Sequence, residues 1–235
     1  MMRELYWKLK NMSKDSILNL AKKKGEDGKY VLELRCNPKE VDGLVGERIG
    51  FLDIETTDLK SDYGIILCYC IKDANSDKIY HDIITPEDIK KYSSKNREIM
   101  AKEDTRVIKS LVRDLANFDR VVTHFGSIFD LPFIRSRAIM CGVDFPTYGV
   151  YVQTDTWRIL KNKFNLSRRS LENSCRQLLG KTNKDHLSLS IKHGCIRGEA
   201  WALKDTLEHC KKDVIDTESL FNTIAPFARQ TKTSI

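Results

Sequence analysis

The stretch GFLDIETTDL, residues 50–59, places two acids inside an otherwise apolar run. Side chains alternate between the two faces of a β-strand, so Asp53 and Glu55 share one face while Leu52 and Ile54 share the other. Acids are seldom buried unless something neutralises their charge. Because a hard divalent cation is the usual neutraliser of several convergent carboxylates, this strand predicts one side of a metal site.

The charge of the chain favours a polyanionic partner. Its 235 residues include 40 Lys and Arg against 33 Asp and Glu, a formal net charge of +7, which is typical of proteins that bind nucleic acid. No run approaches the roughly 18 apolar residues of a membrane span, and the opening residues do not resemble a signal peptide. Seven scattered cysteines form no Cys-x-x-Cys pair. We therefore expect a cytoplasmic protein in a reducing compartment.

The order of the predicted elements indicates one α/β domain with additions at both ends. We expect a basic N-terminal extension over residues 1–48 with a helix and a short strand, a main domain over 49–228 and a tail over 229–235. Within the main domain, alternation and turn signals predict strands at 49–56, 64–72, 77–84, 120–125 and 148–155. Apolar periodicity predicts helices at 104–117, 129–140, 155–163, 171–179 and 199–222, with a loop at 180–198. Three antiparallel and two parallel strands would form a mixed sheet flanked by helices.

A further acid interrupts the apolar segment VVTHFGSIFDLPFI at Asp130. At the start of a helix this carboxylate would satisfy free backbone N–H groups as an N-cap. If the fourth strand lies beside the first, the turn would also aim Asp130 at the edge that carries Asp53 and Glu55. Neither role excludes the other.

The C-terminal helix carries the last group of polar residues beside its apolar stripe. His209 and Asp213 are four residues apart and so share one helix face. Taken alone, the segment EHCKKDVID is equally compatible with a charged, solvated helix edge.

Together these segments supply what two-metal phosphoryl transfer requires. Two Mg²⁺ or Mn²⁺ ions about 3.5–4 Å apart clamp the attacking and leaving oxygens of a phosphodiester, and carboxylates hold the ions. A histidine is a common proton acceptor near neutral pH, so His209 is the candidate that accepts a proton from the attacking water.

Three stretches of the chain resemble the motifs of the DEDD-type (DnaQ-like) 3′→5′ exonucleases of the RNase H-like superfamily. LDIETTDL is similar to the first motif, an Asp-x-Glu followed by Thr, and EHCKKDVIDT is similar to the third. HFGSIFDLPFI is similar to the second motif, with the Phe-Asp pair of family B polymerase proofreading domains and related stand-alone exonucleases. The resemblance spans about residues 49–222, with the motifs in the family's order.

This resemblance implies an RNase H-like fold and a set of site residues. The metal ligands, which are also catalytic, would be Asp53, Glu55, Asp130 and Asp213, with Asp53 between two divalent cations. His209 would join them as a catalytic residue, and Thr56 and Leu59 would contact the terminal nucleotide. Apart from the resemblance, we expect His124 and Phe129 to contact the substrate, although His124 is equally compatible with a hydrogen-bonded histidine at the end of a strand.

The third motif departs from the family pattern in one respect. Relatives with this motif usually carry Tyr four residues before the last Asp, whereas the histidine subclass carries His five residues before it. Here His209 stands four residues before Asp213, which combines the position of one type with the chemistry of the other. Asp58 also stands where many relatives have Gly.

The expected function is a metal-dependent 3′→5′ exonuclease acting on DNA, at single-stranded ends, alone or with a polymerase or another replication or repair protein. An exoribonuclease with the same site is an alternative, because no residue of these motifs is expected to recognise the 2′-hydroxyl of RNA. A catalytically silent nucleic-acid-binding module is a third interpretation. The four acids argue against it, since they would repel the phosphates that such a module binds.

Overall fold

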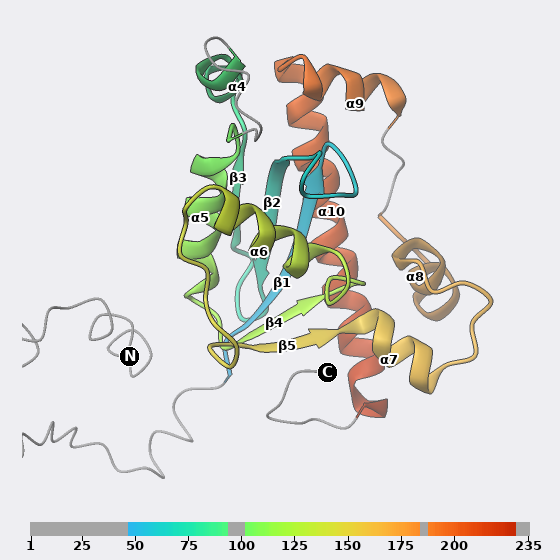
Figure 1. Ribbon diagram of the computed structural model, residues 1–235. Helices are drawn as coiled ribbons and strands as arrows, with labels where there is room; N and C mark the ends of the chain where they lie inside the picture. Colours follow the sequence, from blue (N-terminus) through green and yellow to red (C-terminus); the bar gives the residue numbers. More distant parts are fainter. Residues whose placement is uncertain (1–46, 94–101, 184–187, 229–235) are drawn as a thin grey trace, which may run out of the picture. The chain divides into compact units, whose positions relative to one another are not determined.

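The strand that carries Asp53 and Glu55 lies at the centre of a five-stranded sheet (Figure 1). The structure is a computed structural model that describes residues 47–93, 102–183 and 188–228. The sheet order is β3-β2-β1-β4-β5. The strands are β1 (Ile49–Thr56), β2 (Ile66–Asp73), β3 (Ile79–Ile83), β4 (Arg120–Thr123) and β5 (Val152–Asp155).

The pairing directions confirm the predicted mixed sheet. β1 pairs antiparallel with β2, and β2 pairs antiparallel with β3. β4 lies parallel to β1 on its other side, and β5 lies parallel to β4. The parallel pairing of β1 with β4 brings the ends of these two strands to one edge of the sheet, which is the condition for Asp130 to approach Asp53 and Glu55.

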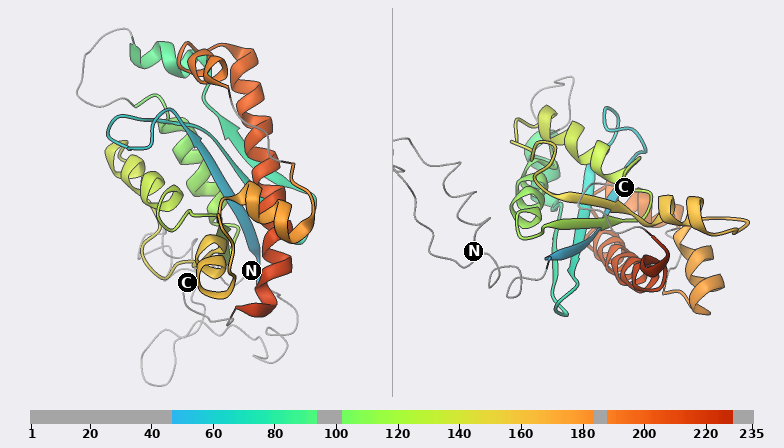
Figure 2. Two further views of the ribbon diagram at one scale, coloured as in Figure 1. Left: turned by 90° about the vertical axis from the view of Figure 1, so that its right-hand side faces the viewer. Right: turned by 90° about the horizontal axis from the view of Figure 1, so that it is seen from below.

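Helices cover both faces of the sheet. The view from below in Figure 2 shows α5 and α6 on one side and α10 on the other. The helices are α4 (Pro86–Ser93), α5 (Thr105–Leu115), α6 (Asp130–Met140), α7 (Thr156–Lys163), α8 (Leu171–Leu179), α9 (Leu189–Ile196) and α10 (Ala200–Ile224), followed by a 3₁₀ turn at Ala225–Phe227.

The two faces of β1 enter two different hydrophobic clusters. Leu52 and Ile54 pack in the cluster that includes residues of α5 and α6. Phe51 packs with Cys210 and Val214 of α10. Because side chains alternate, the acids of β1 lie on the face that α10 covers.

One predicted loop is wrong, because residues 180–198 contain helix α9. Its sequence, LSIKHGCI, lacks amphipathic periodicity and includes a glycine, so the local pattern gives no helix signal. Contacts with α10 stabilise it instead: Gly194 lies so close that a Cβ atom there would be 2.6 Å from that of Ala202. The Cys195 thiol also lies 3.1 Å from the Thr206 hydroxyl.

Some expectations fall wholly or partly outside the described residues. These are the helix and short strand of the N-terminal extension and the tail at 229–235. The proposed division at residue 48 therefore stays a prediction. Among the helices that the structure describes, none combines the length and the apolar character needed to cross a membrane.

Candidate active site

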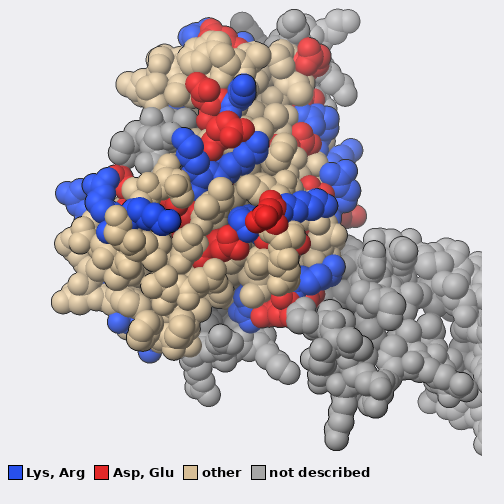
Figure 3. All heavy atoms as spheres, turned by 180° about the vertical axis from the view of Figure 1, so that it is seen from behind, with Lys and Arg blue, Asp and Glu red and all other residues tan. Residues whose placement is uncertain are grey.

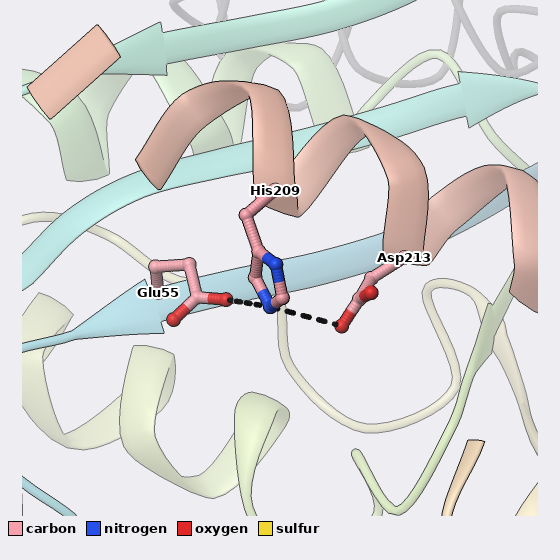
Figure 4. Close-up of side chains that lie close together, drawn as sticks. All are labelled: Glu55, His209 and Asp213. Atoms are coloured by element: carbon pink, nitrogen blue, oxygen red, sulfur yellow. Dashed lines mark ion pairs between the residues drawn. The ribbon is translucent and has the colours of Figure 1, made fainter. Parts of the chain in front are cut away.

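Glu55 of β1 lies close to two polar side chains of α10, His209 and Asp213. His209 Nε2 lies 3.6 Å from Glu55 Oε1 and 3.8 Å from Asp213 Oδ2, so the imidazole stands between the two carboxylates (Figure 4). Potential ligand atoms of the three residues all lie within 4.8 Å of one another. His209 and Asp213 are buried, whereas the Glu55 side chain retains 20% exposure. The cluster thus has one side that opens towards solvent.

Asp130 approaches the same cluster from the start of α6. Its Oδ1 accepts a hydrogen bond of 3.2 Å from the backbone N–H of Ile54, the residue between Asp53 and Glu55. Burial raises the pKa of Asp130 to about 7, and the negative charges of Asp155 and Asp213 act in the same direction. The α6 carboxyl is therefore tied to β1 and lies within electrostatic reach of α10.

Asp53 completes the group from the centre of the sheet. It pairs with Cys70 of β2, and its carbonyl oxygen accepts a 3.4 Å hydrogen bond from the Cys210 thiol of α10. The alternation of β1 places its side chain on the face of Glu55. Of the five residues that the sequence predicts to be catalytic, Glu55, His209 and Asp213 form a compact cluster. Asp130 is bonded to the backbone of the same strand, and Asp53 lies on the strand face of Glu55. Their joint role in a metal site stays a prediction.

This donor set fits divalent cations. Carboxylate oxygens are the ligands that Mg²⁺ and Mn²⁺ prefer, and the convergence of like charges is unfavourable without a counterion. Burial is the main cause of the raised pKa of Asp130 and repulsion by Asp155 and Asp213 adds to it, so a neighbouring cation would favour its carboxylate form.

The predicted substrate-binding residues have varied surroundings. The Leu59 side chain is 77% exposed in the connection that follows β1, and the Thr56 hydroxyl donates to the carbonyl of Asp58 at 2.7 Å. Phe129 packs against Phe133 with ring centroids 5.6 Å apart. The imidazole of His124 lies 2.9 Å from the Thr156 hydroxyl and 2.8 Å from the carbonyl of Arg169. Substrate contact by Thr56, Leu59, His124 and Phe129 stays a prediction.

Sequence reasoning missed Asp155, which is fully buried at the end of β5. Its Oδ1 accepts the backbone N–H groups of Phe125 and Trp157, and its Oδ2 accepts that of Ser127, each at 2.9 Å. It therefore holds the turn that leads to Asp130 and also caps α7. The position of an acid at a strand–helix junction predicts the cap, but its contact with the turn is non-local.

Comparisons with known proteins agree with this architecture. One solved structure with a similar fold is the family B DNA polymerase from the hyperthermophilic archaeon Pyrobaculum calidifontis, at a TM-score of 0.58 and 15% sequence identity. The match covers 78% of this chain but only 25% of the polymerase chain. No curated protein matches the chain. Residues 50–225 match the family model of the RNase_H superfamily. Since this match covers most of the sequence, the protein belongs to the RNase_H superfamily.

Proposed function

We propose that this protein is a metal-dependent 3′→5′ exonuclease that hydrolyses phosphodiester bonds of DNA, acting on single-stranded ends. The observation that carries the proposal is the cluster of Glu55 and Asp213 around the buried His209, with Asp130 of α6 bonded to the backbone of the same strand β1. Membership of the RNase_H superfamily points to nuclease activity. The Asp-x-Glu spacing of β1 and the Phe-Asp pair at the start of α6 favour the exonuclease type within it.

In this proposal Asp53, Glu55, Asp130 and Asp213 hold two Mg²⁺ or Mn²⁺ ions. When bound, such ions supply charge stabilisation at the phosphate and lower the pKa of water. His209 lies between Glu55 and Asp213 and there orients the attacking water or accepts its proton. The burial of His209 and Asp213 excludes bulk water from the side of the site formed by α10.

DNA is the proposed substrate class. The structural similarity to a DNA polymerase supports DNA over RNA and is compatible with a polymerase or another replication or repair protein as partner. The net charge of +7 favours a polyanion. Figure 3 shows Lys and Arg side chains next to Asp and Glu on the face behind that of Figure 1. This face therefore has mixed charge and is not uniformly basic.

The test is a time course on single-stranded DNA and RNA oligomers that carry a 5′ label. We expect a ladder of products shortened one nucleotide at a time from the 3′ end with Mg²⁺ or Mn²⁺, and none with EDTA. Asp53→Ala removes a proposed metal ligand and should abolish the ladder. Asp77→Ala makes the same change at an exposed acid between β2 and β3 and should leave the rate unchanged.

Four outcomes would contradict the proposal. Oligomers that stay intact in every metal while still binding would identify a nucleic-acid-binding module without catalysis. Internal cuts would identify an endonuclease, and a faster ladder on RNA would identify an exoribonuclease. Equal rates for Asp53→Ala and the parent protein would mean that the cluster is not the active site.

A further inference from the structure

Phe125, in the turn between β4 and α6, has an unusual backbone conformation. Its φ is +68°, and among the residues that the structure describes no other non-glycine residue has a positive φ. This region disfavours bulky side chains, and such conformations persist only where surrounding contacts enforce them. They also concentrate at functional sites, so the purpose of an aromatic residue in this turn requires an explanation.

Hydrogen bonds to its backbone hold Phe125 in this positive-φ conformation. Asp155 accepts the Phe125 N–H, and the Phe125 carbonyl accepts N–H groups from Ile128 and Phe129. The side chain nevertheless stays 38% exposed. Core packing therefore does not explain why a phenylalanine occupies a position that glycine would adopt without strain.

The ring of Phe125 has one aromatic partner, Trp157, in the first turn of α7. The two ring centroids are 5.2 Å apart and the planes meet at 76°, an edge-to-face arrangement. The Lys161 Nζ lies 5.3 Å from the centroid of the Trp157 ring, and the exposed Arg158 donates to the hydroxyl of Ser127 in the same turn. Partly exposed aromatic rings beside cationic side chains are the combination that binds unpaired nucleic-acid bases and their backbone.

This aromatic pair lies beside the proposed metal site. Phe125 is five residues before Asp130, and the turn is bonded to α6 because Leu131 N–H donates to the Gly126 carbonyl. Asp155 binds the backbone of both Phe125 and Trp157, and its charge acts on Asp130. Figure 1 shows β4 and β5 side by side, with α7 continuing from β5.

We infer that Phe125 and Trp157 form a stacking platform for one unpaired base of the DNA strand that enters the site. This inference rests on the proposed function and deepens it, because stacking on exposed rings requires a base that is not paired. Base stacking is tolerant of sequence, so the platform would select single-stranded over double-stranded ends without selecting a base.

Binding measured without turnover tests the platform separately from catalysis. In EDTA, a protein with Trp7→Phe and Trp201→Phe keeps Trp157 as its sole tryptophan. A thymidine oligomer should quench its fluorescence. Phe125→Gly should weaken binding about 10-fold or more, while urea unfolding shows a fold that is unchanged or more stable because the strain is relieved.

A matched control uses another edge-to-face pair, Phe164 and Phe227, whose centroids are 5.5 Å apart. Phe227 is 63% exposed, and Phe227→Ala should leave oligomer affinity unchanged.

Oligomers with one abasic position near the 3′ end separate base stacking from a structural role. The parent protein should lose affinity at one abasic position, and Phe125→Gly should lose that sensitivity. Equal sensitivity in both proteins, or an unchanged Trp157 signal on binding, would overturn the platform. Quenching in a protein that cuts no oligomer in any metal would keep the platform and reject the exonuclease.

Discussion

Buried acids at two places in this molecule differ in the side chains that they contact. At the start of α5, the fully buried Asp104 forms a two-point ion pair with Arg137 of α6, with distances of 2.6 Å from Nη2 and 2.9 Å from Nε. Its Oδ2 also accepts the N–H of Ile66. The chain itself thus balances this charge.

At the candidate active site, acids from three elements face one another instead. Asp130 and Asp213 are 4% and 3% exposed, and their mutual repulsion adds to the burial that raises the pKa of Asp130. His209 lies within 4 Å of Glu55 and Asp213, but its charge depends on protonation. Burial of an acid alone therefore does not mark a site. The convergence of acids from separate elements is the stronger sign of a site, because one divalent cation can be held by several carboxylates at once.

Breaking the internal pair should have the largest effect on stability. Arg137→Ala leaves Asp104 buried without its guanidinium, so we expect a loss of about 3–5 kcal/mol in the free energy of unfolding, measured with urea in EDTA. Arg135→Ala, on the exposed side of the same helix, should change it by about 0.5 kcal/mol or less. A loss below about 1 kcal/mol for Arg137→Ala would contradict the stabilising role of the pair.

Removing a charge from the site should have the opposite effect on the metal-free fold. Asp213→Asn relieves repulsion with Asp130, so in EDTA its thermal unfolding temperature should equal or exceed that of the parent protein. Its nuclease rate should fall by about 10²–10³-fold. Mn²⁺ at about 100 times its Kd should stabilise the parent protein by about 2.7 kcal/mol and stabilise the variant far less.

The comparison with Arg137→Ala shows whether the Asp213 carboxylate stabilises the fold or binds a metal. If Asp213→Asn destabilises the protein in EDTA and still responds to Mn²⁺ like the parent, its carboxylate is a structural group like that of Asp104.

The sequence predicts the parts of this site that depend on local spacing. Alternation along β1 places Asp53 and Glu55 on one face, and helical spacing places His209 beside Asp213. The approach of Asp130 depends on β4 lying beside β1. The sequence alone does not determine this neighbour, and the structure shows that the two strands pair in parallel.

What the sequence does not predict depends on non-local contacts. Asp155 binds the N–H groups of Phe125 and Ser127, 30 and 28 residues away along the chain, so no short pattern contains both partners. Helix α9 is similar, because its stability comes from packing against α10 and its own residues carry no helical periodicity. The positive φ of Phe125 is also not predictable from the sequence, since phenylalanine disfavours this conformation and non-local hydrogen bonds hold it.

The histidine at the site can be tested against its unusual position. His209→Ala should lower the rate about 10²-fold if the imidazole orients or deprotonates the water. His209→Tyr places a hydroxyl where exonucleases with a similar third motif carry one, so it should recover part of that loss. His193→Ala, an exposed histidine of α9, should have no effect. Equal rates for the parent protein and His209→Ala would leave the metal ligands in place and remove the role of the imidazole.

Asp155 is intermediate between Asp104 and the acids of the candidate active site, because backbone N–H groups, and not an arginine, bind its carboxylate. In Asp155→Asn the amide oxygen can still accept from Phe125 and Trp157, but the amide nitrogen would face the Ser127 N–H, which is also a donor. The lost hydrogen bond should cost about 1–3 kcal/mol of stability.

The activity of the same variant separates positioning from metal binding. Because its four proposed ligands are intact, Asp155→Asn should keep the stabilisation by Mn²⁺ and lose less activity than Asp213→Asn. Asp114→Asn changes a buried acid of α5 that binds the Tyr69 hydroxyl, and it should lower stability without lowering the rate per folded molecule. If Asp155→Asn also leaves that rate unchanged, the turn before Asp130 keeps its geometry without this carboxylate. Asp155 would then be, like Asp104, an acid that serves the fold alone.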